Sequence, residues 1–167
     1  MKHLIPEFDQ LRARFPEGFA SSMTLPCLRR IQEDRGYVAD EDIAGLAEYL
    51  GVPRIQIEEV LSFYGQFRRA PVGRCHIEAC RNVSCSLLGA ERLIDHLSAR
   101  LGVKPGETTA DGQFSLATVE CMASCGTGPM VVVNGRYHES MDAARVDALI
   151  EANRARAAAW SRNEPEK

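Results

Sequence analysis

Cysteines are the residues of this chain best suited to chemistry, and four of the six form two close pairs. The pairs are Cys80-x4-Cys85 and Cys121-x3-Cys125, with 35 residues between them. The N-terminal segment meets Pro6 and Glu7 before any apolar stretch forms, so we expect no export signal and a cytoplasmic location. Cytosolic thiols are kept reduced, which makes a disulfide framework a poor explanation. Metal binding or redox chemistry is the leading interpretation.

The spacing and type of these candidate ligands favour an iron–sulfur cluster over zinc. Four thiolates with no His or carboxylate in the pattern suit a soft metal. Structural zinc often has two residues between paired ligands, whereas these pairs have four and three. Thioredoxin-type redox catalysis needs Cys-x-x-Cys, a spacing that the sequence lacks. A two-iron, two-sulfur cluster covers a longer ligand-to-ligand distance than a single ion and is normally held by four cysteines. We therefore interpret the four cysteines as ligands of such a cluster, with zinc as the alternative.

The second half of the chain reads as a compact α/β unit. Its apolar spacings predict, in order, a strand, a helix, a strand, a hairpin and a final helix, a plan compatible with a thioredoxin-like sandwich. Asn134-Gly135 is the strongest short hairpin signal in the sequence. The expected elements are a strand within His76–Ala79, a helix from about Ser84 to Arg100, strands at Phe114–Val119, Met130–Val133 and Arg136–His138, and a helix from near Met141.

This plan would bring both cysteine pairs to one edge of the sheet. Cys80 ends the first strand and Cys85 begins the next helix, while Cys121 and Cys125 follow the second strand on a glycine-rich loop. The carboxyl ends of parallel strands share an edge, where ligands collect. Backbone N–H groups at the helix start and beside the loop glycines would point at anionic sulfurs and favour reduction.

The first 67 residues are expected to form three or four short amphipathic helices. Asp40 is a candidate cap at the start of one of them, and Gly36 and Gly51 are candidate C-terminal stops. Such short helices cannot bury their apolar stripes alone, so they need each other, the rest of the chain or a partner. The expected helices are at about Ser22–Arg35, at Asp40–Leu50 and from Pro53 onward.

Composition excludes several classes of protein. The chain has 167 residues, of which 45% are hydrophobic and 26% charged, with a net charge of −3, as in ordinary globular proteins. No basic surplus indicates nucleic acid, and the densest apolar run, Met130–Val133, is far shorter than the ~20 residues that span a membrane. We expect an α/β protein with an N-terminal helical domain (1–70), an α/β domain (71–156) and a tail (157–167), divided at the stretch Arg68–Gly73.

These motifs resemble the family of thioredoxin-like [2Fe-2S] proteins that are subunits of NADH:quinone oxidoreductase, the respiratory complex I. The resemblance covers roughly residues 20–152. The chain departs from the family in one place. The family usually reads Cys-Leu-Gly-Ala-Cys around its second pair, whereas residues 121–125 here read Cys-Met-Ala-Ser-Cys. Ala123 in place of the glycine would alter the N–H···S geometry without threatening ligation. The matching motifs are Cys80-x4-Cys85 with Gly89, GETTADGQFSLATVECMASC (Gly106–Cys125), Gly-Pro before a Val-rich strand, IQEDRGYV (Ile31–Val38) and Phe63-Tyr64-x-x-Phe67.

The resemblance implies a one-electron carrier that has no catalytic residue of its own. Cys80, Cys85, Cys121 and Cys125 would ligate one [2Fe-2S] cluster. FMN and NAD(H) would be bound by a partner flavoprotein of the same complex, in agreement with the lack of a G-x-G-x-x-G phosphate loop here. Further iron–sulfur subunits would complete the complex, and the N-terminal helices would dock on the flavoprotein. The chain would lie peripheral to the inner membrane, without direct insertion, and would be inactive alone.

Two alternatives stay open at this point. Homologous subunits serve NAD-linked formate dehydrogenases and hydrogenases, and the sequence separates these parent complexes poorly. The alternative from another class is a non-catalytic metal-binding module that recognises a protein partner.

The remaining residues of interest have ordinary explanations. Cys27 and Cys75 match no ligand position and are expected to be small buried hydrophobes. His76 is expected to be packed or solvated rather than a ligand. The motif Phe63-Tyr64-x-x-Phe67 is expected to contribute to the core and to a partner-facing surface. The Gly128–Pro129 bond, which precedes the Val-rich strand, is left open between cis and trans.

Overall fold

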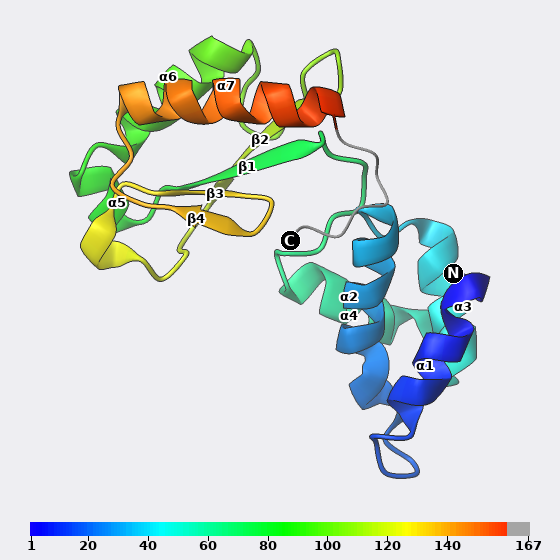
Figure 1. Ribbon diagram of the computed structural model, residues 1–167. Coiled ribbons are helices and arrows are strands. Elements are labelled where there is room, and N and C mark those ends of the chain that lie inside the picture. The colour runs from blue at the N-terminus through cyan, green and yellow to red at the C-terminus, as the bar shows by residue number, and fades with distance from the viewer. Residues whose placement is uncertain (160–167) are drawn as a thin grey trace. The chain divides into compact units, whose positions relative to one another are not determined.

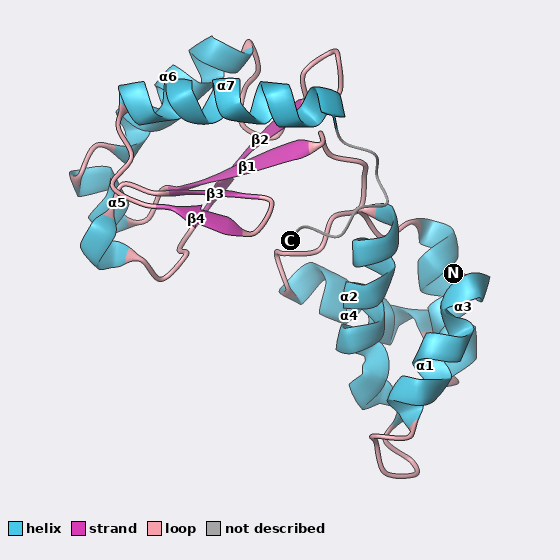
Figure 2. Cartoon of the chain, in the orientation of Figure 1, coloured by secondary structure: helices cyan, strands magenta, loops and turns pink. Residues whose placement is uncertain are grey.

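A computed structural model describes residues 1–159 of the chain. These residues belong to two compact units, Met1–Pro71 and a second unit that begins at Val72. The division falls within the stretch Arg68–Gly73. Figure 1 shows the order of the elements along the chain, and Figure 2 shows that the first unit is all helical whereas the second contains the strands.

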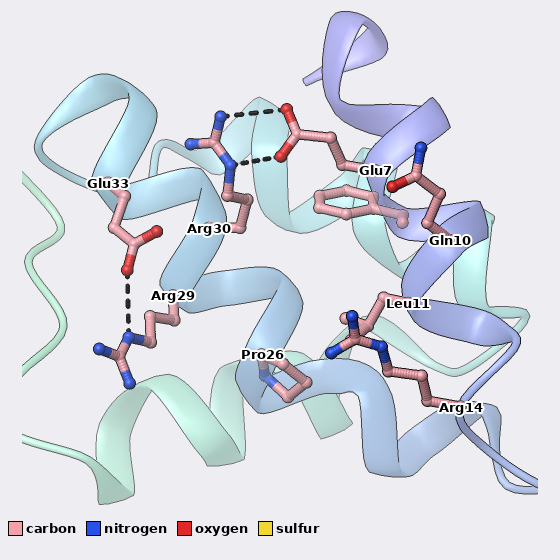
Figure 3. Close-up of a pocket in the computed structure, with 9 residues that line it drawn as sticks. Glu7, Gln10, Leu11, Arg14, Pro26, Arg29, Arg30 and Glu33 are labelled. Atoms are coloured by element: carbon pink, nitrogen blue, oxygen red, sulfur yellow. Dashed lines mark hydrogen bonds and ion pairs between the residues drawn. The ribbon is translucent and has the colours of Figure 1, made fainter. Parts of the chain in front are cut away.

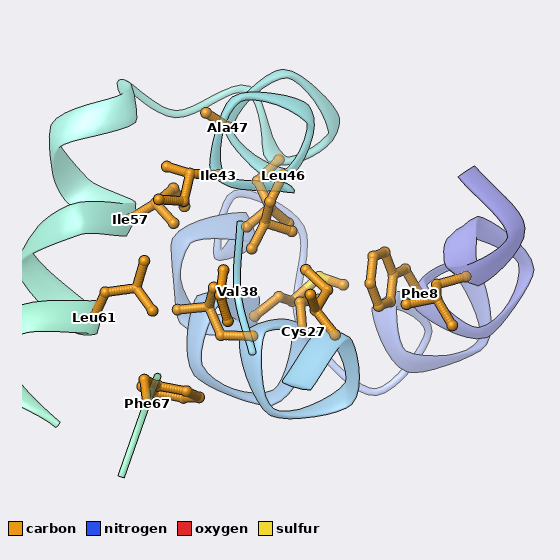
Figure 4. Packing of buried hydrophobic residues seen from close by; sticks show 14 residues of the cluster. Phe8, Cys27, Val38, Ile43, Leu46, Ala47, Ile57, Leu61 and Phe67 are labelled. Atoms are coloured by element: carbon orange, nitrogen blue, oxygen red, sulfur yellow. The ribbon is translucent and has the colours of Figure 1, made fainter. Parts of the chain in front are cut away.

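The first unit consists of short helices around a common apolar core. Figure 4 shows Phe8, Ile43, Leu46 and Ile57 converging in this core, and all four are buried. Burial of one stripe per helix supplies the stability that helices of this length lack in isolation. Its elements are two short 3-10 helices, η1 (Lys2–Leu4) and η2 (Ala20–Met23), and four α-helices, α1 (Ile5–Arg12), α2 (Thr24–Arg35), α3 (Asp40–Leu50) and α4 (Arg54–Phe63).

The ends of these helices follow the sequence signals, with one correction. Gly36 and Gly51 end α2 and α3 in the left-handed region, at φ 90° and 68°, as predicted. Asp40 was expected to cap α3, but it is the first helical residue, and Ala39 occupies the N-cap. The buried Asp42 carboxylate instead accepts a hydrogen bond from the Ala39 N–H at 3.1 Å. A carboxylate at the third helical position thus satisfies the N-terminal donor.

The second unit is a four-stranded mixed sheet with the strand order β2-β1-β3-β4. The β1–β2 pair is parallel, and the β1–β3 and β3–β4 pairs are antiparallel. Figure 1 shows α6 and α7 along one side of this sheet. Its elements are β1 (Cys75–Cys80), α5 (Val83–Leu87), α6 (Ala90–Leu101), β2 (Phe114–Val119), the 3-10 helix η3 (Cys125–Thr127), β3 (Val131–Val133), β4 (Arg136–His138) and α7 (Ala143–Ala159).

The core of this unit lies between the sheet and these two helices. Ile77 of β1 and Leu116 of β2 are buried together with Leu97 of α6 and Val146 of α7. Along β3, Val131 and Val133 join this core, whereas the side chain between them belongs to another cluster. This alternation is the period-two pattern of a strand. The α/β arrangement expected from the sequence for this half of the chain is confirmed.

Three local features of the second unit refine the sequence predictions. The single helix expected from about Ser84 to Arg100 is broken at Gly89, whose φ of 97° cannot continue an α-helix. The predicted hairpin turn forms, with Asn134 and Gly135 at φ 48° and 84°. Gly128–Pro129 is a cis peptide bond.

The C-terminal helix begins later and ends later than expected. Asp142 accepts a hydrogen bond from the Arg145 N–H at 2.8 Å, so α7 begins at Ala143 rather than near Met141. It continues to Ala159, past the expected start of a tail at residue 157. The rest of that tail, 160–167, lies outside the described residues. Across residues 1–159, no helix combines the length and apolarity needed to cross a membrane.

Candidate metal centre

The parallel pairing of β1 and β2 brings the loops that carry the cysteines to one edge of the sheet. Cys80, the last residue of β1, pairs with Val119, the last residue of β2. The Arg81 N–H extends this pairing with a hydrogen bond to the Val119 carbonyl at 2.9 Å. The Cys80 N–H donates to the carbonyl of Met130, which precedes β3, at 3.3 Å. The segments after β1, after β2 and before β3 therefore meet at this edge.

The first cysteine pair is buried beside this edge. Cys80 and Cys85 are 3% and 2% exposed, in a small apolar cluster with Ala90, Met130 and Val132. Burial raises the pKa of the Cys85 thiol to about 11, helped by a hydrogen bond with Cys80 and by the charges of Cys80 and Cys125, while a backbone hydrogen bond from Met130 opposes the rise. The pKa of Cys85 thus responds to two of the other candidate ligands, Cys80 and Cys125.

The second cysteine pair lies on the exposed loop between β2 and β3. Cys121 and Cys125 are both exposed, and Cys125 begins the short helix η3. The Ala123 N–H donates to Cys121 Sγ at 3.3 Å. The Cys80 thiol donates to the carbonyl of Glu120, at an Sγ–O distance of 3.6 Å, which links the two pairs.

An ion pair also joins the two cysteine loops. The Arg81 guanidinium donates twice to one carboxylate oxygen of Glu120, at 2.6 and 3.0 Å. Arg81 follows Cys80 directly and Glu120 precedes Cys121 directly. Because both side chains are exposed, the pair contributes little stability, and it serves as a further contact between the two cysteine-bearing segments.

Ala123 has a strained backbone conformation at this site. Its φ is 59°, in the left-handed region where glycine is favoured. An L-residue in this region costs about 1–2 kcal/mol. The structure therefore gives a physical reason for the glycine expected at this position, and the alanine keeps the N–H directed at Cys121 Sγ.

The residues at this edge fit an iron–sulfur cluster. Cys80 ends β1, Cys85 lies in α5 directly after it, and Cys121 and Cys125 follow the end of the neighbouring strand β2; thiolates are the ligands of such clusters. A side chain at Gly128 would place Cβ 3.2 Å from Cys85 Sγ, so glycine lets the second loop approach the first. Among residues 1–159, no three His, Cys, Asp or Glu side chains are grouped as they would be around a single metal ion.

The other sequence candidates are placed outside this edge. Cys27 belongs to the core of the helical unit, where burial raises its pKa to about 12, and Cys75 belongs to the core of the sheet unit. Both are buried hydrophobes, as predicted. His76 is buried within β1, with Nε2 3.8 Å from a Glu78 carboxylate oxygen. It is packed rather than grouped with the cysteines.

A pocket also lies between α1 and α2 of the helical unit (Figure 3). Two of its arginines are held by neighbouring carboxylates: Arg30 donates to both oxygens of Glu7, at 2.6 and 3.1 Å, and Arg29 donates to Glu33 at 3.1 Å. It is lined by Glu7, Phe8, Gln10, Leu11, Arg14, Pro26, Arg29, Arg30 and Glu33 and contains no cysteine.

Sequence reasoning missed one group of side chains at the cysteine edge. The Glu139 carboxylate, which follows β4, accepts hydrogen bonds from the hydroxyls of Ser124 and Thr127. These two residues flank Cys125. The only local signal was the presence of hydroxyl residues beside that cysteine, and nothing in the sequence paired them with a residue beyond the hairpin.

Comparison with known proteins places these features in a family. A family model described as thioredoxin-like [2Fe-2S] ferredoxin matches residues 8–154. The chain is 42% identical to an NADH-quinone oxidoreductase subunit of Rhizobium meliloti, over 89% of this chain and 88% of that protein. It is 39% identical to NADH-quinone oxidoreductase subunit 2 of Thermus thermophilus, over 88% of this chain and 82% of that protein.

A solved structure gives a similar result. A chain of an NAD+-reducing [NiFe]-hydrogenase in the air-oxidized state is 29% identical, with a TM-score of 0.70 over 80% of this chain. Our chain spans only 23% of that hydrogenase chain.

Replacing Ala123 by glycine should stabilise the protein. The change removes the Cβ from a left-handed residue, and the gain outweighs the entropy that glycine adds to the unfolded chain. We expect the free energy of unfolding to rise by about 0.5–1 kcal/mol in denaturant titrations. Ala148→Gly, on the exposed face of α7, is the control, and it should lower that free energy by about 1 kcal/mol. Equal destabilisation by both changes would contradict the strain at Ala123.

Replacing Gly128 by alanine should weaken metal retention at the cysteine edge. The new Cβ would meet Cys85 Sγ at 3.2 Å and Leu88 Cδ1 at 3.1 Å, so one of them must move. We expect less iron and sulfide bound per chain after reconstitution and gel filtration. Gly126→Ala is the matched control, because a Cβ there meets nothing within 4 Å. Equal iron content in the two variants would show that the close approach of Gly128 is unimportant.

Proposed function

The chain belongs to the thioredoxin-like [2Fe-2S] ferredoxin family, and on that premise we propose that it is an electron-transfer subunit of an NADH:quinone oxidoreductase. In this proposal Cys80, Cys85, Cys121 and Cys125 hold one [2Fe-2S] cluster. The observation that carries the proposal is the parallel β1–β2 pairing, which ends both strands at the edge where the cysteine loops meet. The two relatives named as subunits of NADH-quinone oxidoreductase support the choice of complex.

The role of the chain's own residues follows from their burial. When bound, the cluster supplies a centre that takes up and releases one electron. Cys80 and Cys85 hold it from the buried side, where low polarity and apolar neighbours such as Met130 surround the sulfurs. Cys121 and Cys125 hold it from the exposed side, which is the side a redox partner can approach. The Ala123 N–H donates to a ligand sulfur and so stabilises its negative charge.

The partner in this proposal is a flavoprotein of the same complex that binds FMN and NAD(H). The present chain contributes no catalytic residue and is inactive alone, because hydride chemistry belongs to the flavin. The partner's flavin would supply single electrons, and the four cysteines of the present chain would hold the cluster that accepts them. In this proposal the chain lies on the cytoplasmic side, peripheral to the inner membrane through the complex that it forms with the flavoprotein and further iron–sulfur subunits.

A second candidate is the corresponding subunit of an NAD-linked hydrogenase or formate dehydrogenase. The hydrogenase chain that shares this fold over 80% of our chain supports it. The cysteines would hold the same kind of cluster, but electrons would pass from another donor toward NAD+ instead of from NADH toward a quinone.

The helical unit Met1–Pro71 is the proposed docking arm for the flavoprotein. Phe63 ends α4 with its side chain 80% exposed, and Tyr64 beside it is also exposed, with ring centroids 5.0 Å apart. Phe67, by contrast, is buried in the core of the unit. Large exposed aromatic rings are common anchors of protein interfaces.

Electron transfer from the flavoprotein tests the proposed function. NADH mixed with the reconstituted chain alone should leave the visible absorption of the cluster unchanged. Adding the FMN-containing partner in catalytic amounts should bleach it, at one electron per chain, in an anaerobic stopped-flow experiment. Bleaching by NADH without the flavoprotein, or none with it, would contradict the proposal.

Replacing Phe63 by alanine tests the docking arm. The side chain is exposed, so we expect an unchanged melting temperature and cluster spectrum, but affinity for the flavoprotein lowered about tenfold, measured by isothermal titration calorimetry. Phe19→Ala, which removes another exposed ring of the same unit (58%), is the control and should bind like the wild type. Wild-type affinity of the Phe63 variant would refute this docking surface.

A further inference from the structure

We propose that Glu139 is a positioning residue for the exposed cysteine pair and fixes the loop that carries Cys121 and Cys125. The inference rests on the proposed function, since the conformation it fixes is that of the cluster ligands. It concerns a residue 14 positions after Cys125 in the sequence, on the far side of the β3–β4 hairpin.

Glu139 forms hydrogen bonds with the loop on both sides of Cys125. Its carboxylate oxygen Oε1 accepts hydrogen bonds from Ser124 Oγ and from Thr127 Oγ1, the latter at 2.6 Å. The two hydroxyls also lie within hydrogen-bond distance of each other, at 2.8 Å. These hydrogen bonds lower the pKa of Glu139, with Ser124 the larger contributor, so the group is an acceptor-only carboxylate at neutral pH.

Backbone hydrogen bonds next to Glu139 hold the same loop. The Ser140 N–H donates to the Thr127 carbonyl at 2.6 Å, and the Met141 N–H donates to the Pro129 carbonyl at 2.8 Å. Arg145 of α7 in turn donates to the Ser140 carbonyl at 2.7 Å. The connection from β4 to α7 is therefore tied to the loop by several hydrogen bonds. Its side-chain contacts with the loop are the Glu139 carboxylate and the Ser140 hydroxyl, which donates to the Thr127 carbonyl at 3.5 Å.

The loop that Glu139 contacts includes an unfavourable backbone conformation at Ala123. Ala123, directly before Ser124, has a φ of 59°, which is unfavourable for an L-residue. This conformation directs the Ala123 N–H at Cys121 Sγ. By fixing Ser124, Glu139 opposes relaxation of Ala123 and so preserves a hydrogen bond to a ligand sulfur.

Two consequences follow for the cluster, and they can be separated by substitution. Hydrogen bonds to ligand sulfurs raise the reduction potential, and a nearby negative charge lowers it. Glu139→Gln removes the charge but keeps an oxygen that both hydroxyls can reach. Glu139→Ala removes the charge and the anchor together. The Ala variant should therefore have a lower potential than the Gln variant, although both lack the charge.

The experiment uses the full chain reconstituted with iron and sulfide. Iron release to an excess of chelator is followed by absorbance, and potentials are measured by EPR-monitored titration. We expect Glu139→Ala to release iron about three- to tenfold faster than the wild type, and Glu139→Gln to stay near the wild-type rate. Glu151→Ala is the matched control, because Glu151 is exposed on α7 and pairs with Arg100. It should leave both readouts unchanged.

A double-mutant cycle shows whether Glu139 acts through the hydroxyls. Thr127→Val preserves the shape of the side chain while removing the donor, and it should also speed iron release. Combined with Glu139→Ala, it should add less than its separate effect, since both changes remove the same hydrogen bond. If the Glu139→Ala chain does not fold, Thr127→Val alone decides: faster release supports the proposal, and a wild-type rate overturns it.

The outcomes distinguish this inference from the proposed function. Glu139→Ala with the release rate of Glu151→Ala and the potential of Glu139→Gln would overturn the positioning role, while the cluster itself would stand. A wild-type chain that takes up no iron and sulfide would overturn both.

Discussion

The parallel pairing of β1 with β2 is the constraint on which the rest of the site depends. Because the strands run in the same direction and end in register at Cys80 and Val119, the chain leaves both at the same edge. Cysteines 36 positions apart in the sequence, Cys85 and Cys121, thereby follow neighbouring strand ends. The antiparallel strand β3 begins at this edge too, so the loop from β2 must return over the first cysteine pair before it enters the sheet.

The site combines a rigid buried half with an exposed half that is held by side chains. Cys80 and Cys85 belong to a strand end, a helix and a small apolar cluster, whose packing leaves them little freedom. Cys121 and Cys125 lie on a loop outside the sheet, where contacts with Arg81 and Glu139 replace regular structure. Such an arrangement suits electron transfer, because the centre stays shielded on one side and accessible on the other.

Much of this architecture could be predicted from the sequence because it depends on local signals. The cysteine spacing, the Asn134-Gly135 turn and the strand Phe114–Val119 are each encoded within a few residues. Cys27 and Cys75 could be predicted to be buried because they fit no ligand spacing, and both are buried.

Other features could not be predicted, either because the local pattern allowed more than one structure or because the contact joins residues far apart in the sequence. The helix break at Gly89 was hidden by continuous apolar spacing, because glycine is tolerated within a helix at a modest cost. At the start of α3, the Ala39 N–H donates to Asp42, at the third helical position, and not to Asp40, the candidate at the first position. Glu139 reaches Ser124 and Thr127 only after the β3–β4 hairpin has formed, so no short motif reports it.

The most direct test of the central claim is an EPR spectrum of the anaerobically purified, dithionite-reduced chain, with iron and acid-labile sulfide assayed on the same sample. We predict a spin-half signal of about one spin per chain, with about two irons and two sulfides. A silent spectrum from a chain that carries stoichiometric zinc would contradict this claim, and would return the four cysteines to a structural, non-redox role.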